Sequence, residues 1–145
     1  DYMRSLYLDT NNERIYALCL DVNDRMMACR VVSDGDIDSS ALDIRKLASI
    51  VLEVKAKRVV LSHNHPNGSL TPSHNDAVAT KVAGELLNLL KVQLKDHIIV
   101  TDKSYFSFFS SPRTIFKPIG SKLNSFSVKL SFIKRPRSVL NCERW

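Results

Sequence analysis

Residues 58–76 decide the fold, and they read RVVLSHNHPNGSLTPSHND. Residues 58–62 form a short apolar run, which is typical of a buried strand. Residues 63–72 contain two prolines and a glycine, so they predict a loop. A helical apolar period begins at Asp76 and continues to residue 90. The stretch therefore predicts a strand, a polar loop and a helix in succession, which is a unit of an α/β fold.

The residues before this stretch predict a hairpin and a helix. Residues 14–22 and 25–32 are rich in β-forming side chains and are separated by a short turn, which indicates two antiparallel strands. Residues 41–54 show a helical period, and Ser40 and Asp43 are predicted to form the capping box at its start. The helix is expected to bury one apolar face, made of Leu42, Leu47, Ile50, Val51 and Val54.

The residues from Asp76 onward are predicted to complete a mixed sheet flanked by helices. The helix over residues 76–90 is expected to turn its large apolar side chains to the core, namely Val78, Val82, Leu86, Leu89 and Leu90. Residues 96–101 and 105–109 predict two further strands. This order of strands and helices predicts the α/β class, with a mixed β-sheet and helices packed on it.

Positive charge gathers at the C-terminal end of the chain. The chain has 145 residues, a length typical of one domain, and a formal net charge of +6. Residues 112–145 hold eight Lys and Arg against one Glu, whereas residues 1–111 hold 13 basic against 14 acidic side chains. Residues 112–145 also contain three prolines and no sustained period, so they predict an irregular tail with at most a short strand at 126–133. We therefore expect a folded domain over residues 1–111 and a basic extension over residues 112–145.

Cysteine content and hydropathy favour a cytoplasmic protein. The three cysteines include no CxxC pair, so no disulfide scaffold is predicted, and Cys19 and Cys29 fit as small core residues of the predicted hairpin. No apolar run approaches the roughly 18 residues of a transmembrane helix, and the first ten residues lack the apolar core of a signal peptide. We expect a cytoplasmic location without membrane contact, and the oligomeric state is not predicted.

The polar loop carries a predicted metal site. His63 and His65 are two residues apart, so a strand that continued through them would place both imidazoles on one face. Two neutral imidazoles side by side are a pair of zinc ligands, and Asp76, eleven residues later, supplies a carboxylate as a third. Two histidines and one carboxylate, with the fourth position left for water, are typical of catalytic zinc. The helical HExxH motif of many metalloproteases is absent from the sequence.

Each of these residues also has a purely structural interpretation. Ser73 and Asp76 are spaced as a capping box, and an acidic residue is favoured in the first turn of a helix. The two interpretations are compatible, since Ser73 can cap the helix while Asp76 turns to a metal. His63 and His65 alone can be loop histidines bonded to the backbone. His97, at the start of a predicted strand, is expected to be structural, with its ring hydrogen-bonded near the site.

Several separated motifs resemble one family of metalloproteases. The string H-x-H-P at residues 63–66, followed by S-x-x-D at residues 73–76, resembles the JAMM (MPN+) motif. The fuller strings HNHPNG and TPSHND, followed by DHIIV at residues 96–100, look like the RadC-like branch of that family. Upstream, the strand that follows Glu13 and the Gly35 that follows the second strand are similar to the same branch. The motifs occur in the order of the family and cover most of the chain before the basic extension.

The resemblance implies a zinc-dependent metallohydrolase that cleaves a peptide or isopeptide-type amide, with a sheet-and-helix arrangement like that of cytidine deaminases. By position in the motif, His63, His65 and Asp76 match the ligands of one zinc ion per chain. Glu13 matches the glutamate that acts as general base on the metal-activated water, although alone it would be interpreted as a solvated acid before a strand. Ser73 matches the serine that hydrogen-bonds the tetrahedral intermediate.

The basic extension supports a second hypothesis. RadC-like proteins are historically named as DNA repair factors, and a net charge of +7 over residues 112–145 fits contacts with nucleic-acid phosphates. The chain would then be a DNA-binding module with a non-catalytic metal site, whereas a solvated extension explains the same charge without a partner. A metal-binding scaffold without turnover is a third alternative. The expected partner is a peptide or protein substrate, and the DNA-binding hypothesis adds nucleic acid, bound through the extension over residues 112–145. The sequence lacks the helical region that often precedes this domain in RadC-like proteins, which favours a fragment or a short member of the family.

Overall fold

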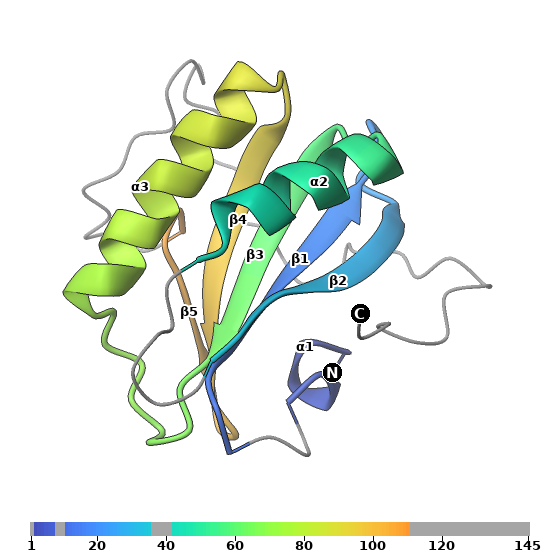
Figure 1. Cartoon of the computed structure of the whole chain (residues 1–145). Coiled ribbons are helices and arrows are strands. Elements are labelled where there is room, and N and C mark those ends of the chain that lie inside the picture. The colour runs from blue at the N-terminus through green and yellow to red at the C-terminus, as the bar shows by residue number, and fades with distance from the viewer. Residues whose placement is uncertain (1, 8–10, 36–41, 111–145) are drawn as a thin grey trace.

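A five-stranded sheet in the order β2-β1-β3-β4-β5 forms the centre of the molecule (Figure 1). It is seen in a computed structural model that describes residues 2–7, 11–35 and 42–110. The strands are β1 (Arg14–Leu20), β2 (Met26–Asp34), β3 (Arg58–Asn64), β4 (Gln93–Val100) and β5 (Tyr105–Ser107). The helices are α1 (Tyr2–Ser5), α2 (Ile44–Val54) and α3 (His74–Leu89). The predicted α/β class is confirmed, and the extension over residues 112–145, with its predicted strand, lies outside the described residues.

β1 and β2 form the predicted antiparallel hairpin. β1 ends at Leu20, two residues earlier than predicted, and the chain reverses through Asp24, whose φ of 58° is left-handed. The Asp24 carboxylate lies 2.8 Å from Arg58 Nη1 and 3.0 Å from Lys95 Nζ. The hairpin turn is therefore tied by ion pairs to the beginnings of β3 and β4.

β3 lies between β1 and β4 and runs through Asn64, two residues further than predicted. It pairs antiparallel with β1 and parallel with β4, and α3 makes the crossover that a parallel pair requires. His63 pairs with Ile15 on one side and with Ile99 on the other, and Asn64 pairs with Val100. The loop begins at His65 rather than at His63 as predicted, because pairing with neighbouring strands keeps the backbone extended through His63 and Asn64, where the apolar run has already ended.

α2 covers the sheet over β1 and β2, and α3 covers the same face over β4 (Figure 1). α2 buries three of the side chains predicted for its core face, Leu47, Ile50 and Val51. The capping box predicted at Ser40 is wrong, because Asp43 is itself the N-cap of the helix. The Asp43 carboxylate accepts the backbone N–H of Lys46 at 2.9 Å, which satisfies a donor that the helix leaves unpaired.

α3 presents a different face to the sheet from the one predicted. Its buried side chains are Thr80, Ala83 and Leu87. Three side chains predicted to be buried are 46%, 38% and 78% exposed, namely Val78, Val82 and Leu89. Two others pack against the core while partly exposed, Leu86 and Leu90. The rotation of the helix follows from Asp76, whose carboxylate faces β3, because residues four, seven and eleven positions later share its face.

The strands alternate between two apolar cores. In β1, the core on the α2 and α3 side takes Ile15, Ala17 and Cys19, and the opposite core takes Tyr16, Leu18 and Leu20. α1, which the sequence did not predict, packs on the second core through Met3. Cys19 and Cys29 are fully buried as predicted, and burial raises the pKa of the Cys19 thiol to about 12. Within the described part of the chain, no helix is long and apolar enough to cross a membrane.

Candidate metal centre

His63 and His65 lie on one face at the carboxyl end of β3. Strand pairing continues through Asn64, and the His65 N–H donates to the Val100 carbonyl at 3.2 Å. Residues two apart in an extended chain point to the same side, and the two imidazole centroids are 4.8 Å apart. Both side chains are buried, His63 at 2% exposure and His65 at 8%. The geometry on which the predicted histidine pair depended is therefore present.

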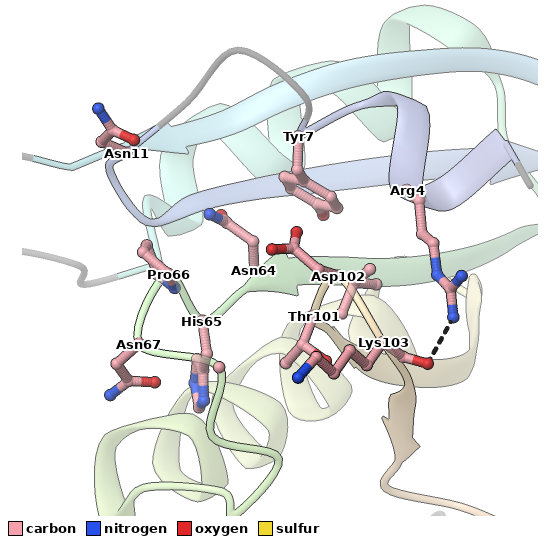
Figure 2. A pocket seen from close by; sticks show the side chains of 12 residues that line it. Arg4, Tyr7, Asn11, Asn64, His65, Pro66, Asn67, Thr101, Asp102 and Lys103 are labelled. Carbon is pink, nitrogen blue, oxygen red and sulfur yellow. Dashed lines mark hydrogen bonds between the residues drawn. The ribbon is translucent and has the colours of Figure 1, made fainter.

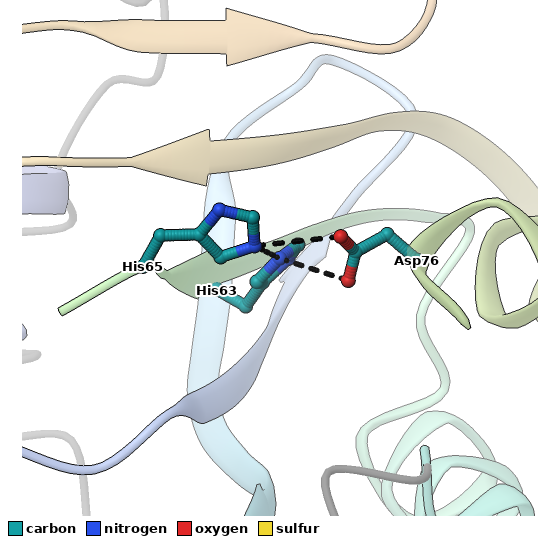
Figure 3. Close-up of side chains that lie close together, drawn as sticks. All are labelled: His63, His65 and Asp76. Carbon is teal, nitrogen blue, oxygen red and sulfur yellow. Dashed lines mark hydrogen bonds and ion pairs between the residues drawn. The ribbon is translucent and has the colours of Figure 1, made fainter. Parts of the chain in front are cut away.

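Asp76 reaches the two histidines from the first turn of α3. The Ser73 hydroxyl accepts the Asp76 N–H at 3.1 Å, and Asp76 Oδ2 accepts the Ser73 N–H at 2.7 Å, which completes a capping box. Asp76 Oδ1 lies 3.1 Å from His63 Nε2, and Oδ2 lies 3.4 Å from His65 Nε2 (Figure 3). One carboxylate thus serves the helix terminus and faces both imidazoles, so the two interpretations of Asp76 hold together.

The three side chains have the spacing of a metal-ligand set. Their ligand atoms all lie within 4.8 Å of one another, and the two histidine Nε2 atoms are 2.9 Å apart. A tetrahedral zinc centre with bonds of about 2.0–2.1 Å separates its ligand atoms by about 3.3 Å. The nitrogens are 2.9 Å apart, and each has an Asp76 oxygen near that separation, Oδ1 at 3.1 Å from His63 and Oδ2 at 3.4 Å from His65. His63, His65 and Asp76 therefore form a candidate metal site whose donor atoms and spacing fit zinc.

Negative charge in this site is held on Asp76. Burial acts to raise the pKa of Asp76, but the hydrogen bonds with His63 and His65 outweigh it and hold the pKa well below its usual range. The hydrogen bond to the same carboxylate raises the pKa of His65, against the effect of burial. A carboxylate that stays ionised beside two imidazoles attracts a divalent cation at neutral pH.

His97, on β4, contacts His63. The contact is made at Nδ1 of His63, the ring nitrogen that does not face Asp76. His97 Nε2 lies 2.8 Å from His63 Nδ1, and His97 Nδ1 lies 2.7 Å from Thr80 Oγ1. The ring is 1% exposed and stacks on Phe108, with centroids 5.1 Å apart. Burial lowers the pKa of His97 well below its ordinary value, so the ring is neutral. This position agrees with the expectation of a histidine hydrogen-bonded near the site.

Glu13 lies just before β1, half-buried, and its charge acts to raise the pKa of His65. Asn64, between the two histidines, holds the backbone on both sides of Glu13. Its Nδ2 donates to the Asn12 carbonyl at 3.0 Å, and its Oδ1 accepts the Arg14 N–H at 2.8 Å. Sequence reasoning missed Asn64, although strand alternation places it on the face opposite the histidines. The role of Glu13 as general base stays a prediction.

Ser73 and His74 lie at the exposed edge of the site. The Ser73 hydroxyl accepts a hydrogen bond from the Asp76 N–H, so the helix uses one of its two lone pairs. Its predicted contact with a reaction intermediate stays a prediction. His74 is the first residue of α3, and its exposed side chain is outside the cluster of three ligand residues.

A cleft of about 730 Å³ opens beside His65 (Figure 2). The residues that line it include Arg4, Tyr7, Asn64, His65, Thr101 and Lys103. Arg4 Nη2 donates to the Lys103 carbonyl at 2.9 Å, and the Tyr7 hydroxyl donates to Ser62 Oγ at 2.7 Å. These bonds fasten the N-terminal segment to β3, which carries the two histidines, and to the β4–β5 turn. A segment in which the sequence predicted no helix or strand therefore forms one wall of the cleft.

A buried His-His-Asp cluster at the end of a central strand defines the class of this protein as an α/β domain with a candidate metal site. The family model of the RadC-like JAB domain matches residues 1–115. The chain belongs to the RadC-like JAB domain family, and the resemblance inferred from its motifs is confirmed.

Relatives of the chain are UPF0758 proteins of bacteria. One from Photobacterium profundum is 36% identical over 107 residues, which cover 74% of this chain and 48% of that protein. One from Chlorobaculum parvum is 31% identical over 108 residues, which cover 74% and 49%. One from Finegoldia magna is 36% identical over 95 residues, which cover 66% and 43%. The chain thus spans about half the length of the curated relatives it matches.

Proposed function

We propose that the chain is a zinc-dependent hydrolase that cleaves a peptide or isopeptide-type amide. The observation that carries the proposal is the convergence of His63, His65 and Asp76, from β3 and α3, at distances of 2.9 to 3.4 Å. Membership of the RadC-like JAB domain family supports the same chemistry. The carboxylate of Glu13, which acts on His65 through its charge, supplies the acid–base group that a hydrolase needs beside its metal.

Bound zinc would lower the pKa of a coordinated water to about 7 and polarise a substrate carbonyl. His63, His65 and Asp76 would hold the ion through two neutral nitrogens and one negative oxygen, which would leave a net positive centre. Glu13 accepts a proton from the attacking water and returns it to the leaving amine. Asn64 fixes the backbone on both sides of Glu13 and so limits where that carboxylate can move.

Ser73 has the position of an oxyanion donor in this proposal. Its oxygen accepts the Asp76 N–H at 3.1 Å, and its own proton is directed to the substrate oxygen that becomes negatively charged. A single donor of this kind contributes about 10²–10³ in rate. The capping box and the oxyanion contact use different faces of the same hydroxyl, so one residue serves both.

The cleft beside His65 is the proposed position of the substrate chain. The exposed residues of the β4–β5 turn, Asp102 and Lys103, present polar groups along it (Figure 2). An extended peptide needs such groups, because its own N–H and C=O groups lose water when it binds. The alternative of DNA binding rests on the charge of residues 112–145 and on the historical naming of RadC-like proteins, and the described residues add no observation in its favour.

The first experiment measures zinc content and peptide hydrolysis in three proteins. We expect the wild type to bind one zinc per chain and to cleave members of a quenched fluorescent peptide library. Glu13→Gln keeps the zinc, but its rate of hydrolysis falls about 10²–10⁴-fold, because it lacks the group that transfers the proton. Asp76→Asn loses stoichiometric zinc, because an amide is a much weaker ligand than a carboxylate.

Three outcomes would contradict the proposal. A wild type that binds no zinc would exclude the metal site. A zinc-loaded wild type that cleaves none of the peptides would exclude the peptide hydrolase and favour a scaffold without turnover. A Glu13→Gln variant with the wild-type rate would exclude Glu13 as the base. Thermal unfolding of each variant, measured without metal, confirms that the comparison is made on folded protein.

A further inference from the structure

We propose that His97 and Thr80 are positioning residues that fix the tautomer of His63, so that its Nε2 presents a lone pair to the metal. The inference rests on the proposed metal site and adds two residues to it. Neither residue belongs to the cluster of three ligands. Their role is to decide where a proton sits on a ligand, and they do so through a short chain of buried hydrogen bonds.

The chain of hydrogen bonds leads from one ligand to another. His63 Nδ1 is 2.8 Å from His97 Nε2, and His97 Nδ1 is 2.7 Å from Thr80 Oγ1. Thr80 Oγ1 in turn lies 2.6 Å from the backbone carbonyl of Asp76. His97 is 1% exposed and Thr80 is 2% exposed, so bulk water does not compete for these contacts. Each bond therefore has to be satisfied by the next group in the chain.

The direction of every hydrogen bond in this chain follows from the acceptor at its end, the backbone carbonyl of Asp76. A carbonyl oxygen only accepts, so the single hydroxyl proton of Thr80 goes to the Asp76 carbonyl. His97 Nδ1 must then carry the proton that Thr80 Oγ1 accepts. A neutral imidazole has one N–H, so His97 Nε2 accepts and His63 Nδ1 donates. His63 Nε2 faces Asp76 Oδ1 at 3.1 Å, and it would present its lone pair there once a metal ion displaces the proton of that hydrogen bond.

The second ligand reaches the same state by a simpler route. His65 Nδ1 lies 2.8 Å from the backbone carbonyl of Ser69, so it must donate, and its Nε2 is the nitrogen that faces the ligand cluster. His63 is at the centre of the sheet, with paired strands on both sides, and a ring from the neighbouring β4 takes the place of a loop carbonyl. A ring can accept or donate, and Thr80 removes that ambiguity.

The plane of the His97 ring is also fixed. The ring stacks on Phe108 with an interplanar angle of 12°. The backbone N–H of His97 donates to the Asp96 carboxylate at 2.8 Å. A ring that cannot turn keeps both nitrogens in line with their partners. The opposite tautomer would put a proton on His97 Nε2, move the His63 proton to Nε2, and block that nitrogen as a ligand.

The experiment compares Thr80→Val with Thr80→Ser. Valine has the shape of threonine but accepts no hydrogen bond, so His97 Nδ1–H would lose its partner. Serine keeps the hydroxyl. Zinc affinity is measured by competition with a chromogenic chelator, and imidazole tautomers are read from ¹⁵N–¹H correlations of the metal-free and zinc-loaded proteins. We expect Thr80→Val to weaken zinc binding about 10-fold or more, and Thr80→Ser to stay within about threefold of wild type.

The tautomer of His97 separates this inference from the proposed function. We expect Nδ1–H in the wild type and in Thr80→Ser, and Nε2–H in Thr80→Val. A wild-type His97 protonated on Nε2 would overturn the inference whether or not zinc binds, and this measurement needs no variant to fold. Equal zinc affinities for the valine and serine variants would also overturn it. A wild type with the expected His97 tautomer but no zinc binding would overturn the metal site and leave the hydrogen-bond chain intact.

Discussion

α2 and α3 cover the same face of one sheet, yet they are held there by different means. α2 buries a stripe of aliphatic side chains, and its N-cap Asp43 faces its own backbone. α3 buries Thr80, Ala83 and Leu87, while its N-terminal Asp76 faces the histidines of β3. The apolar stripe therefore orients α2, whereas a polar residue at the N-terminal end orients α3.

The comparison explains why the buried face of α2 was predicted correctly and the buried face of α3 was not. Apolar periodicity reports which face is buried only when burial of apolar surface sets the rotation. In α3 the stripe with the larger side chains, Val78, Val82 and Leu89, lies toward solvent. The face that starts at Asp76 has smaller residues, which allow α3 to pack against β4, where His97 reaches Thr80.

The largest expected effect tests α2 as a purely apolar support. Leu47 is fully buried, so Leu47→Ala removes most of a side chain from the core and lowers the free energy of unfolding by about 2–5 kcal/mol. The zinc affinity of the folded variant should stay within about twofold, because α2 does not contribute to the ligand cluster. Chemical denaturation and chelator competition measure the two quantities.

Leu52→Ala is the matched control on the same helix. Leu52 is 60% exposed, so we expect a change below about 0.5 kcal/mol. If Leu47→Ala also weakened zinc binding tenfold in folded protein, α2 would be coupled to the site and the contrast between the helices would be wrong.

Local sequence patterns predicted the elements of the sheet well, and what they missed depends on contacts between distant residues. The apolar run of residues 58–62 predicted β3, but its extension through His63 and Asn64 comes from pairing with Ile15 and Val100. No property of HNHPNG alone distinguishes a strand end from a loop.

The sequence predicted the candidate ligand residues, but it did not predict two of the residues that hydrogen-bond around them. His63, His65 and Asp76 were found because residue type and spacing carry metal chemistry. Asn64 and Thr80 were missed, since a buried amide or hydroxyl is defined by partners 52 residues or 17 residues away in the chain. Their backbone and ring partners become visible only in three dimensions.

A second prediction concerns β4, the strand on which α3 packs. Asp96 is 1% exposed, and burial raises its pKa to about 6, although hydrogen bonds from Ser107 and from backbone N–H groups act in the opposite direction. The folded state therefore binds the Asp96 proton more tightly than the unfolded state. The stability this proton adds is complete below about pH 4 and is lost as the pH rises through about 6.

Comparison with Asp96→Asn isolates this group, because asparagine resembles the protonated acid in shape and charge. Between pH 4 and pH 6, the free energy of unfolding of the wild type should fall relative to Asp96→Asn by about 2 kcal/mol. The measurement is made by denaturation of metal-free protein at each pH. A difference that stays constant with pH would show that the pKa of Asp96 is the same in the folded and the unfolded protein, which would contradict the prediction.

The smallest expected effect is the sharpest test of the rotation of α3. Leu87 and Leu89 are two residues apart in the same helix, at 0% and 78% exposure. Leu89→Gln should change the free energy of unfolding by less than about 0.5 kcal/mol, because glutamine and leucine have similar helix propensities and the side chain is already in water. Leu87→Ala, in contrast, should cost about 2–5 kcal/mol. If Leu89→Gln proved the more costly of the two, α3 would bury its larger stripe, and Asp76 and Thr80 would be turned away from the histidines. A near-zero result for Leu89 therefore supports the rotation of α3 that turns Asp76 and Thr80 toward the histidines.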